Sequence, residues 1–426
     1  MYFSNSSHRL KSIIAVALIF IAYANITFAE HKKSVFFAPY EVISEGPGYH
    51  WFGYYDKFQT SYDDRYFLTM KVDFDRRSPN PDDEIEVGYF DSNNDYAYTK
   101  IGTSKAWCWQ QGCQLQWRPE SKNEILWNDR IDGKFVTKVY NIETREFRFL
   151  PEPIYHLSPD GMWGLGVDFA RLDHMRRGYG YAGIPDKNKD VLAPEDSYIY
   201  KIHLDTGEVV NLISVATVAE QYGPENGKHY FNHPQWNTDG SRFLFVHRWR
   251  VPGKGGFITR KLTLSNTGED LRILSDEPGS SHHAWRDKDH VLMFIRNSYR
   301  LIRDDGKQEK EIIWNEGNGH QTYLENKDWV ITDTYPKKND YQRVYLRNLK
   351  TKTNIPLAEI YLPRDEYRGK EWRIDTHPRL TRKQDRVIID AWIDEEQGRQ
   401  QIILDMKHII GNNGHKPRHK KEKHGY

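Results

Sequence analysis

Four histidines recur at corresponding places along the second half of the chain. His233 begins HPQWNTDG, His282 begins HHAWRDKD, His320 begins HQTYLENKD, and His377 begins HPRLTRKQD. An aromatic residue or Leu follows each of them three positions later, and then come a turn and an apolar segment. Imidazole nitrogens bind transition metals and transfer protons near neutral pH. If the four rings converge, the repeats predict either a metal site or a site for proton transfer.

The same repeat occurs three more times toward the N-terminus, where its leading residues are Phe58, Trp117 and Leu157. The seven units are spaced by roughly 40 to 80 residues, which fits four-stranded blades with loop insertions. Segments such as IDGKFVTKVYNI between the units are hairpin signals. The pattern predicts an all-β fold, a seven-bladed β-propeller, in which equivalent blade positions meet at the axis. A β-sandwich with coincidental repeats is the alternative.

The four histidines have three interpretations. As metal ligands they would offer nitrogens to one divalent ion, Zn²⁺ before Ca²⁺, and no organic cofactor is expected. As proton carriers they would line a substrate cleft. As core residues they would only form hydrogen bonds to the blade backbone.

An insertion of about 28 residues after the strand MWGLGVDF departs from the repeat. It concentrates basic and aromatic side chains, and Arg side chains pair well with carboxylate or sulfate groups. Within it we expect substrate contacts from His174, Arg177 and Tyr179, and outside it from Arg248, which ends a strand of the fourth blade. The alternative is a lid that surface ion pairs hold in place.

Two further segments predict residues at the mouth of the channel. GYHWFGYYDKF has much polar aromatic character for a plain core strand, and we place His50, Tyr55 and Lys57 at the mouth. Gln111, in WCWQQGCQLQW, faces the same way by alignment of the repeats. Cys108 and Cys113, in the same segment, are equally compatible with a local disulfide and with free thiols.

The ends of the chain and its charge predict where it acts. Residues 1–29 have the pattern of a secretory signal peptide, residues 30–410 form the propeller, and residues 411–426 form a basic tail. We therefore expect a secreted or periplasmic monomer without a membrane span. The formal net charge of +1 gives no reason to expect bulk nucleic-acid binding. The 13 Trp and 27 Tyr suit both blade packing and the stacking of sugar rings.

GYHWFGYYDKF, the Arg- and Tyr-rich insertion and the HPQWNTDG-type repeats resemble the secreted seven-bladed propeller polysaccharide lyases. The resemblance is greatest to the ulvan lyases, and the oligogalacturonate lyases are more distant. It implies β-elimination at a uronic acid in an acidic polysaccharide. In that reaction a cation neutralises the carboxylate, a base removes the C5 proton, and an acid protonates the leaving oxygen.

The resemblance also implies roles for individual residues. Tyr155 matches the family's acid/base Tyr, and Arg171 matches the Arg that neutralises the carboxylate. Tyr230 is the candidate for a second catalytic Tyr. A buried aromatic in the blade core is the alternative for Tyr155.

One departure from the family concerns the substrate. The family has two active-site histidines upstream of its Tyr, but residues 51–155 contain no His. Gln110 or Gln111 would replace one of them, and His50 or His156 the other. A lyase for another uronic-acid exopolysaccharide or for pectic oligomers is therefore an alternative. A non-catalytic propeller that binds glycan or protein is a further alternative, because fold does not imply function.

Overall fold

The structure is a computed structural model that describes residues 32–305, 310–315, 317–336 and 339–410. The chain divides into residues 1–33 and the unit 34–426, and the following concerns the second unit. The predicted signal peptide and basic tail lie outside the described residues. Among the described helices, none is long and apolar enough to cross a membrane.

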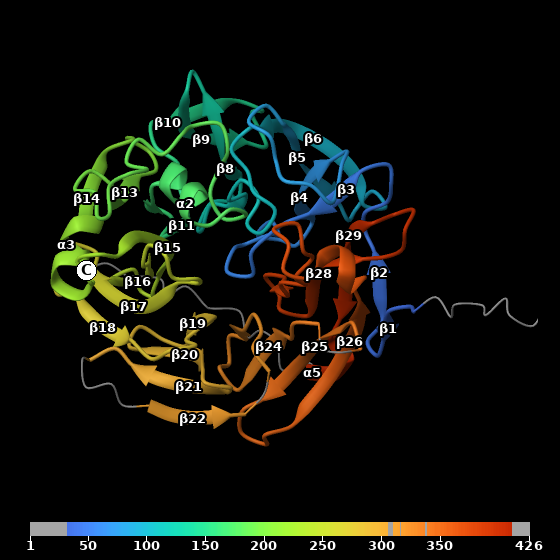
Figure 1. The fold of residues 1–426 in the computed structure, drawn as a ribbon. Helices are drawn as coiled ribbons and strands as arrows, with labels where there is room; N and C mark the ends of the chain where they lie inside the picture. Colours follow the sequence, from blue (N-terminus) through green and yellow to red (C-terminus); the bar gives the residue numbers. More distant parts are fainter. Residues whose placement is uncertain (1–31, 306–309, 316, 337–338, 411–426) are drawn as a thin grey trace, which may run out of the picture. The chain divides into compact units, whose positions relative to one another are not determined.

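Seven antiparallel sheets follow one another around a ring, which Figure 1 shows face on. The prediction of a seven-bladed β-propeller is therefore confirmed. In each blade the innermost strand comes first, and Trp117, Trp236 and Trp285 lie in or at the end of such strands. The repeat found in the sequence thus marks the innermost strands.

The first four blades are consecutive along the chain. Blade 1 contains β3 (Tyr49–Trp51), β4 (Tyr66–Val72), β5 (Ile85–Asp91) and β6 (Ala97–Ser104). Blade 2 contains β7 (Gln116–Trp117), β8 (Glu124–Ile131), β9 (Lys134–Asn141) and β10 (Phe147–Leu150). Blade 3 contains β11 (His156–Leu157), β12 (Trp163–Gly166), β13 (Tyr198–His203) and β14 (Val209–Ser214). Blade 4 contains β15 (Lys228–Trp236), β16 (Arg242–Arg250), β17 (Ile258–Ser265) and β18 (Arg272–Ser275).

The last three blades involve both ends of the described chain. Blade 5 contains β19 (His283–Trp285), β20 (His290–Ile295), β21 (Ser298–Arg303) and β22 (Lys310–Trp314). Blade 6 contains β23 (Thr322–Tyr323), β24 (Trp329–Asp333), β25 (Tyr341–Asn348) and β26 (Asn354–Tyr361), with β1 (Val35–Phe36) as a fifth strand. Blade 7 contains β27 (Arg379–Leu380), β28 (Arg386–Trp392), β29 (Arg399–Asp405) and β2 (Tyr40–Val42). The pairing of β2 with β29 closes the ring.

Short helices lie in the connections between strands. They are α2 (Phe169–Met175), α3 (Val215–Tyr222), α4 (Arg364–Tyr367) and α5 (Lys407–Ile410). The α2 helix begins inside the insertion of blade 3, and the Asp168 side chain accepts a hydrogen bond from the Arg171 N–H at its N-terminus. The insertion is therefore a structured element of the propeller.

Turn chemistry explains the hairpins. Asp132 and Gly133 join β8 to β9 and both have positive φ values, 49° and 73°. Such values are typical of a two-residue hairpin turn, and Asp-Gly adopts them at little cost. The apolar core lies between neighbouring blades, and the cluster between blades 1 and 2 contains Trp51, Trp107 and Trp127.

Candidate active site at the propeller axis

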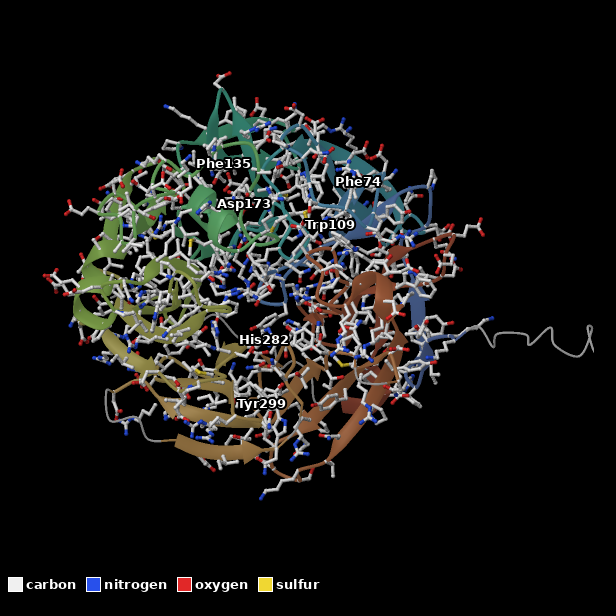
Figure 2. All side chains as sticks on the ribbon, in the orientation of Figure 1. Phe74, Trp109, Phe135, Asp173, His282 and Tyr299 are labelled. Atoms are coloured by element: carbon white, nitrogen blue, oxygen red, sulfur yellow. The ribbon has the colours of Figure 1, made fainter. Side chains whose placement is uncertain are left out.

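Three of the four repeat histidines meet at the axis. The ring centroid of His320 is 4.1 Å from that of His282 and 4.2 Å from that of His377. Figure 2 shows His282 near the middle of the ring, whereas Tyr299 of the same blade lies further out. His233 lies on the other side of Tyr54, whose ring is 5.1 Å from His233 and 5.0 Å from His377.

Neighbouring side chains orient the clustered imidazoles. His320 Nδ1 lies 3.0 Å from both carboxylate oxygens of Asp333, which also accept hydrogen bonds from Thr376 Oγ1 and the His377 N–H. His282 Nδ1 lies 3.0 Å from Asn318 Oδ1. Both contacts place the proton on Nδ1 and leave Nε2 with a lone pair, as the outer partners of metal-bound histidines do.

The cluster has the donors of a metal site. One donor atom each from His320, Asp375 and His377 lies within 4.8 Å of the other two, and all three residues are buried. His377 Nε2 and Asp375 Oδ1 are buried without a hydrogen-bond partner among the described residues. Unpaired buried polar atoms cost free energy, so a cation between them would offset that cost. Nitrogen and carboxylate ligands suit Zn²⁺ or another divalent transition metal.

His233 belongs to a separate network with Tyr155. The bulge between Asn232 and Gln235 in β15 gives His233 a φ of 50°, a strained backbone that re-aims its side chain. His233 Nδ1 lies 2.9 Å from Tyr155 Oη and 3.2 Å from Gln111 Nε2, and Gln111 Nε2 also donates to Tyr155 Oη. Burial first, and then Arg248 and Arg176, lower the pKa of His233 well below its ordinary value, so the ring is neutral at pH 7.

Three cations line a cavity of about 60 Å³ beside His233 and His282. They are Arg176, Arg248 and Lys261, and none of them forms a salt bridge with a described carboxylate. Arg248 donates to Thr259 Oγ1, and one guanidinium nitrogen each of Arg176 and Arg248 is buried without a partner. Burial lowers the pKa of Arg248 to about 10 and that of Lys261 well below its usual range. Buried basic groups without carboxylate partners favour an anion, and the cavity has room for a carboxylate or a few waters.

Tyr179 also lines this cavity, and two guanidinium groups contact it. Its hydroxyl accepts a hydrogen bond of 2.8 Å from Arg373 Nη2, and the Arg176 guanidinium lies 4.1 Å from the ring centroid. Burial raises the pKa of Tyr179, but Arg373 and then Arg176 outweigh burial, so the pKa lies below its ordinary value. A Tyr with a lowered pKa exchanges protons more readily near neutral pH.

The structure does not bring Arg171 into this site. All five of its N–H donors are used: Nε donates to His229 O, Nη1 to Asp186 and Asn188 O, and Nη2 to Val191 O and Leu192 O. Arg171 therefore has no donor left for a substrate carboxylate, and its role here is to hold the insertion. Tyr155 is fully buried, and burial raises its pKa well above 10.

Three other residues that the sequence analysis predicted for the site, Tyr55, Lys57 and Tyr230, are buried. Tyr55 packs its ring 5.2 Å from that of His320, at the axis. The buried Lys57 forms an ion pair of 3.0 Å with Asp56, and its Nζ lies 4.9 Å from the centroid of the Tyr155 ring. Tyr230 is buried next to Arg248 across the strand pair β15–β16.

The remaining predicted contacts lie away from the axis. His50 packs inside blade 1 against Phe90 and Tyr98, and its placement at the channel mouth does not hold. His174 and Arg177 are exposed on the insertion, where His174 Nε2 contacts Lys228 Nζ at 2.9 Å.

The two cysteines are free thiols in this structure. Both are buried, and Cys108 Sγ contacts Gly112 O at 3.7 Å, whereas Cys113 Sγ contacts Met70 Sδ at 3.5 Å. Burial raises the pKa of Cys108 to about 12, so the thiol stays protonated and unreactive at neutral pH.

The sequence analysis missed several axial residues. Lys261, Arg373 and Tyr335 come from strands or loops whose local sequence does not distinguish them. Asp375 had a signal, because it stands two positions before the repeat histidine His377. A carboxylate this close to a predicted ligand is itself a candidate ligand.

Comparison with known proteins supports the fold. No protein-family model matches the chain, and no curated protein matches it. Among solved structures, an oligogalacturonate lyase in complex with manganese is 13% identical, with a TM-score of 0.64 over 88% of this chain and 95% of that chain. An oligogalacturonate lyase from Vibrio parahaemolyticus is also 13% identical, with a TM-score of 0.59 over 88% of this chain and 98% of that chain. At this identity the likeness concerns the propeller architecture.

Proposed function

We propose that this propeller is a polysaccharide lyase that cleaves a uronate-containing acidic glycan by β-elimination. One observation carries the proposal: Arg176, Arg248 and Lys261 surround a small buried cavity without carboxylate partners, next to a Tyr with a lowered pKa. A uronate carboxylate would supply the missing anion. Neutralising that carboxylate makes the adjacent C5 proton more acidic, which is the first requirement of the reaction.

Tyr179 is the proposed acid/base. As a phenolate held by Arg373, it takes the C5 proton, the C4–C5 double bond forms, and the C4–O bond to the leaving sugar breaks. The resulting phenol then gives its proton to the leaving oxygen, which restores the phenolate. His233 lies beside it, with ring centroids 5.6 Å apart, and can orient the substrate from its Nε2 atom.

This assignment moves the acid/base role that the resemblance implied. Tyr155 is enclosed, and its hydroxyl faces Gln111, Asn232 and His233. We therefore assign Tyr155 to positioning His233. Arg176, Arg248 and Lys261 take the carboxylate-neutralising role that the resemblance gave to Arg171.

A divalent metal fits the second cluster of the axis. His320, His377 and Asp375 would hold it, and Asp333 would orient His320. Bound there, the ion would supply positive charge that stabilises a carboxylate and the negative charge that develops next to it. The oligogalacturonate lyase of similar fold is described as a complex with manganese. We propose Zn²⁺ first, because two imidazoles and one carboxylate are a usual protein ligand set for it.

There are two candidate substrates for this reaction. Ulvan is the proposal that follows from the resemblance in the sequence. Oligogalacturonate is the second candidate, because the axial cavity is small and enclosed, which suits the end of a short oligomer. Because residues 1–29 have the pattern of a signal peptide, we also propose that the chain is exported.

The experiment is an elimination assay that follows the ultraviolet absorbance of the unsaturated uronyl product, with ulvan and oligogalacturonate as substrates. We expect product from one of them, and a loss of about 100-fold or more in kcat/KM for Arg248→Ala. Arg250→Ala is the matched control, since Arg250 lies two residues later in β16 and is exposed. The proposal is wrong if Arg248→Ala keeps the wild-type rate. Glycan binding without product would favour a non-catalytic propeller.

A further inference from the structure

A second and larger cavity lies at the other end of the propeller axis. Its volume is about 790 Å³, within the range of about 300 to 1,000 Å³ that is usual for ligand pockets. The axial histidines lie at the starts of the innermost strands, whereas this cavity is lined by residues at their ends. Among the lining residues are Phe58, Trp236, Trp285, Tyr323 and Leu380. Four of them follow the repeat histidines by three positions, Phe58 is the corresponding residue of the first repeat, and none of the five lines the axial cavity.

The two cavities are separate sites. Tyr54 lines the axial cavity, and Tyr55, Asp56 and Lys57 line the larger one, so one short segment stands between them. The Tyr54 and Tyr55 rings are 4.7 Å apart and both are buried. Because the Tyr54 and Tyr55 rings lie between the two cavities, a ligand in the larger cavity does not reach Tyr179.

The walls of the cavity suit a sugar ring. Phe58 and Tyr62 are 45% and 63% exposed, and Trp285 and Tyr323 contribute further aromatic surface. Aromatic faces bind apolar C–H surface, and sugars present such surface on one side of each ring. The exposed rings of Phe58 and Tyr62 are therefore available to stack on a sugar and do not belong to the packed core.

Unpaired polar atoms line the same walls. Gln235 Oε1, Gln321 Oε1 and Trp236 Nε1 are buried without a hydrogen-bond partner among the described residues. Two acceptors and one donor match the hydroxyl groups of a carbohydrate, because a buried polar atom without a partner costs free energy.

Cations add a preference for acidic sugars. Lys327, Arg382 and Lys383 line the cavity and outnumber the acidic Asp63 and Glu325 there, since Asp56 pairs with Lys57. The Arg382 guanidinium stacks 3.6 Å from the centroid of the Phe58 ring, and its Nε donates to Thr60 O. This stacking holds Arg382 in place and leaves both of its Nη atoms available for a carboxylate.

We propose that this cavity is a second, non-catalytic binding site for an acidic oligosaccharide, on the face opposite the axial site. Phe58 and Tyr62 stack on sugar rings, and Arg382 and Lys327 bind uronate carboxylates. The site needs no elimination chemistry, so it does not depend on the function proposed for the axial cavity.

The test is calorimetric titration of the full chain with a galacturonate hexamer, using Arg248→Ala to weaken the axial site. Lys327→Gln/Arg382→Gln, added to Arg248→Ala, should lower the remaining affinity about 10-fold or more. Lys100→Gln/Lys350→Gln is the control, because it removes the same charge from exposed positions outside both cavities. Tyr62→Ala is a second test that spares the Arg382 hydrogen bonds, and it should also weaken binding.

Each outcome bears on this site separately from the axial one. If the hexamer binds equally well after both cavity substitutions, the second site does not exist. If binding depends on Arg382 but no substrate yields unsaturated product, the second site stands and the proposed lyase activity fails. A neutral cello-oligosaccharide that binds as tightly as the acidic hexamer would overturn the assignment of the cations.

Discussion

At the scale of single residues, two buried Tyr side chains near the axis differ in the direction in which their pKa is shifted. Tyr155 has its pKa raised by burial, whereas Tyr179 has its pKa lowered by Arg373 and Arg176 despite burial. The difference lies in the neighbours, since both rings are enclosed. Only a Tyr whose phenolate is stabilised can both take and return a proton at neutral pH.

We predict that Tyr179→Phe lowers kcat by about 100-fold or more while the KM changes little, because the ring still packs and only the hydroxyl is lost. Turnover by the wild type should rise with pH as the phenol ionises. Arg373→Gln should move that rise to higher pH, because Arg373 lowers the pKa of Tyr179 more than Arg176 does. Steady-state kinetics across pH measure both effects.

Tyr181→Phe is the control for this prediction. Tyr181 lies two positions later in the same insertion, but its hydroxyl accepts a hydrogen bond from Asn128 Nδ2 and contacts no Arg among the described residues. An unchanged kcat in Tyr179→Phe would show that another group carries the proton.

The sequence predicted the kind of side-chain pair but not its members. A Tyr paired with an Arg was expected, and the resemblance to the lyases gave Tyr155 with Arg171. In the structure the Tyr179 hydroxyl contacts Arg373, which is 194 positions away. Contacts of this length depend on closure of the ring, so local spacing does not predict them. The repeat histidines were predictable because the repeat itself places them.

At the scale of elements, the insertion of blade 3 is a folded unit held by one side chain. Arg171 lies in α2 and donates to carbonyl groups of residues 188, 191 and 192, further along the same insertion, and to His229 O in β15. The insertion presents Arg176 and Tyr179 to the axis. Arg171 thus holds the insertion that carries Arg176 and Tyr179, the residues we propose for binding and catalysis.

We predict that Arg171→Ala lowers the free energy of unfolding by about 3 to 5 kcal/mol, because it leaves Asp186 buried without its ion-pair partner. Activity should fall together with stability. Arg177→Ala is the control: Arg177 is an exposed neighbour in the same insertion and should change stability by less than about 0.5 kcal/mol. Urea unfolding of both variants measures the difference, and equal stabilities would contradict the role of Arg171.

At the scale of the whole molecule, the propeller encloses many neutral histidines. Burial lowers the pKa of His50 to about 3 and that of His156 to about 4, and it also lowers the pKa of His233, His247 and His283 well below the ordinary value. The unfolded chain binds protons at these positions near pH 6.5, whereas the folded chain does not. Acid therefore favours the unfolded state.

We predict that stability is greatest above pH 6.5 and falls as the pH decreases toward 4. Each such histidine contributes about 1.4 kcal/mol per pH unit in this window. His50→Gln should reduce the loss between pH 6.5 and 5 by about 2 kcal/mol, because one titrating group is removed. Urea midpoints measured across pH test this, and a stability independent of pH below 6.5 would contradict it.

The ring also constrains how the chain folds. Two N-terminal strands complete blades near the end of the chain: β1 pairs with β26, and β2 pairs with β29, where Tyr40 lies opposite Leu404, 364 positions later (404 − 40). Contacts between such distant segments form slowly, since the closure entropy comes before the gain from pairing. Until β29 has been made, β2 presents an unpaired edge that invites pairing with other chains. We therefore expect closure of the ring to come late in folding, and aggregation to be most frequent before it.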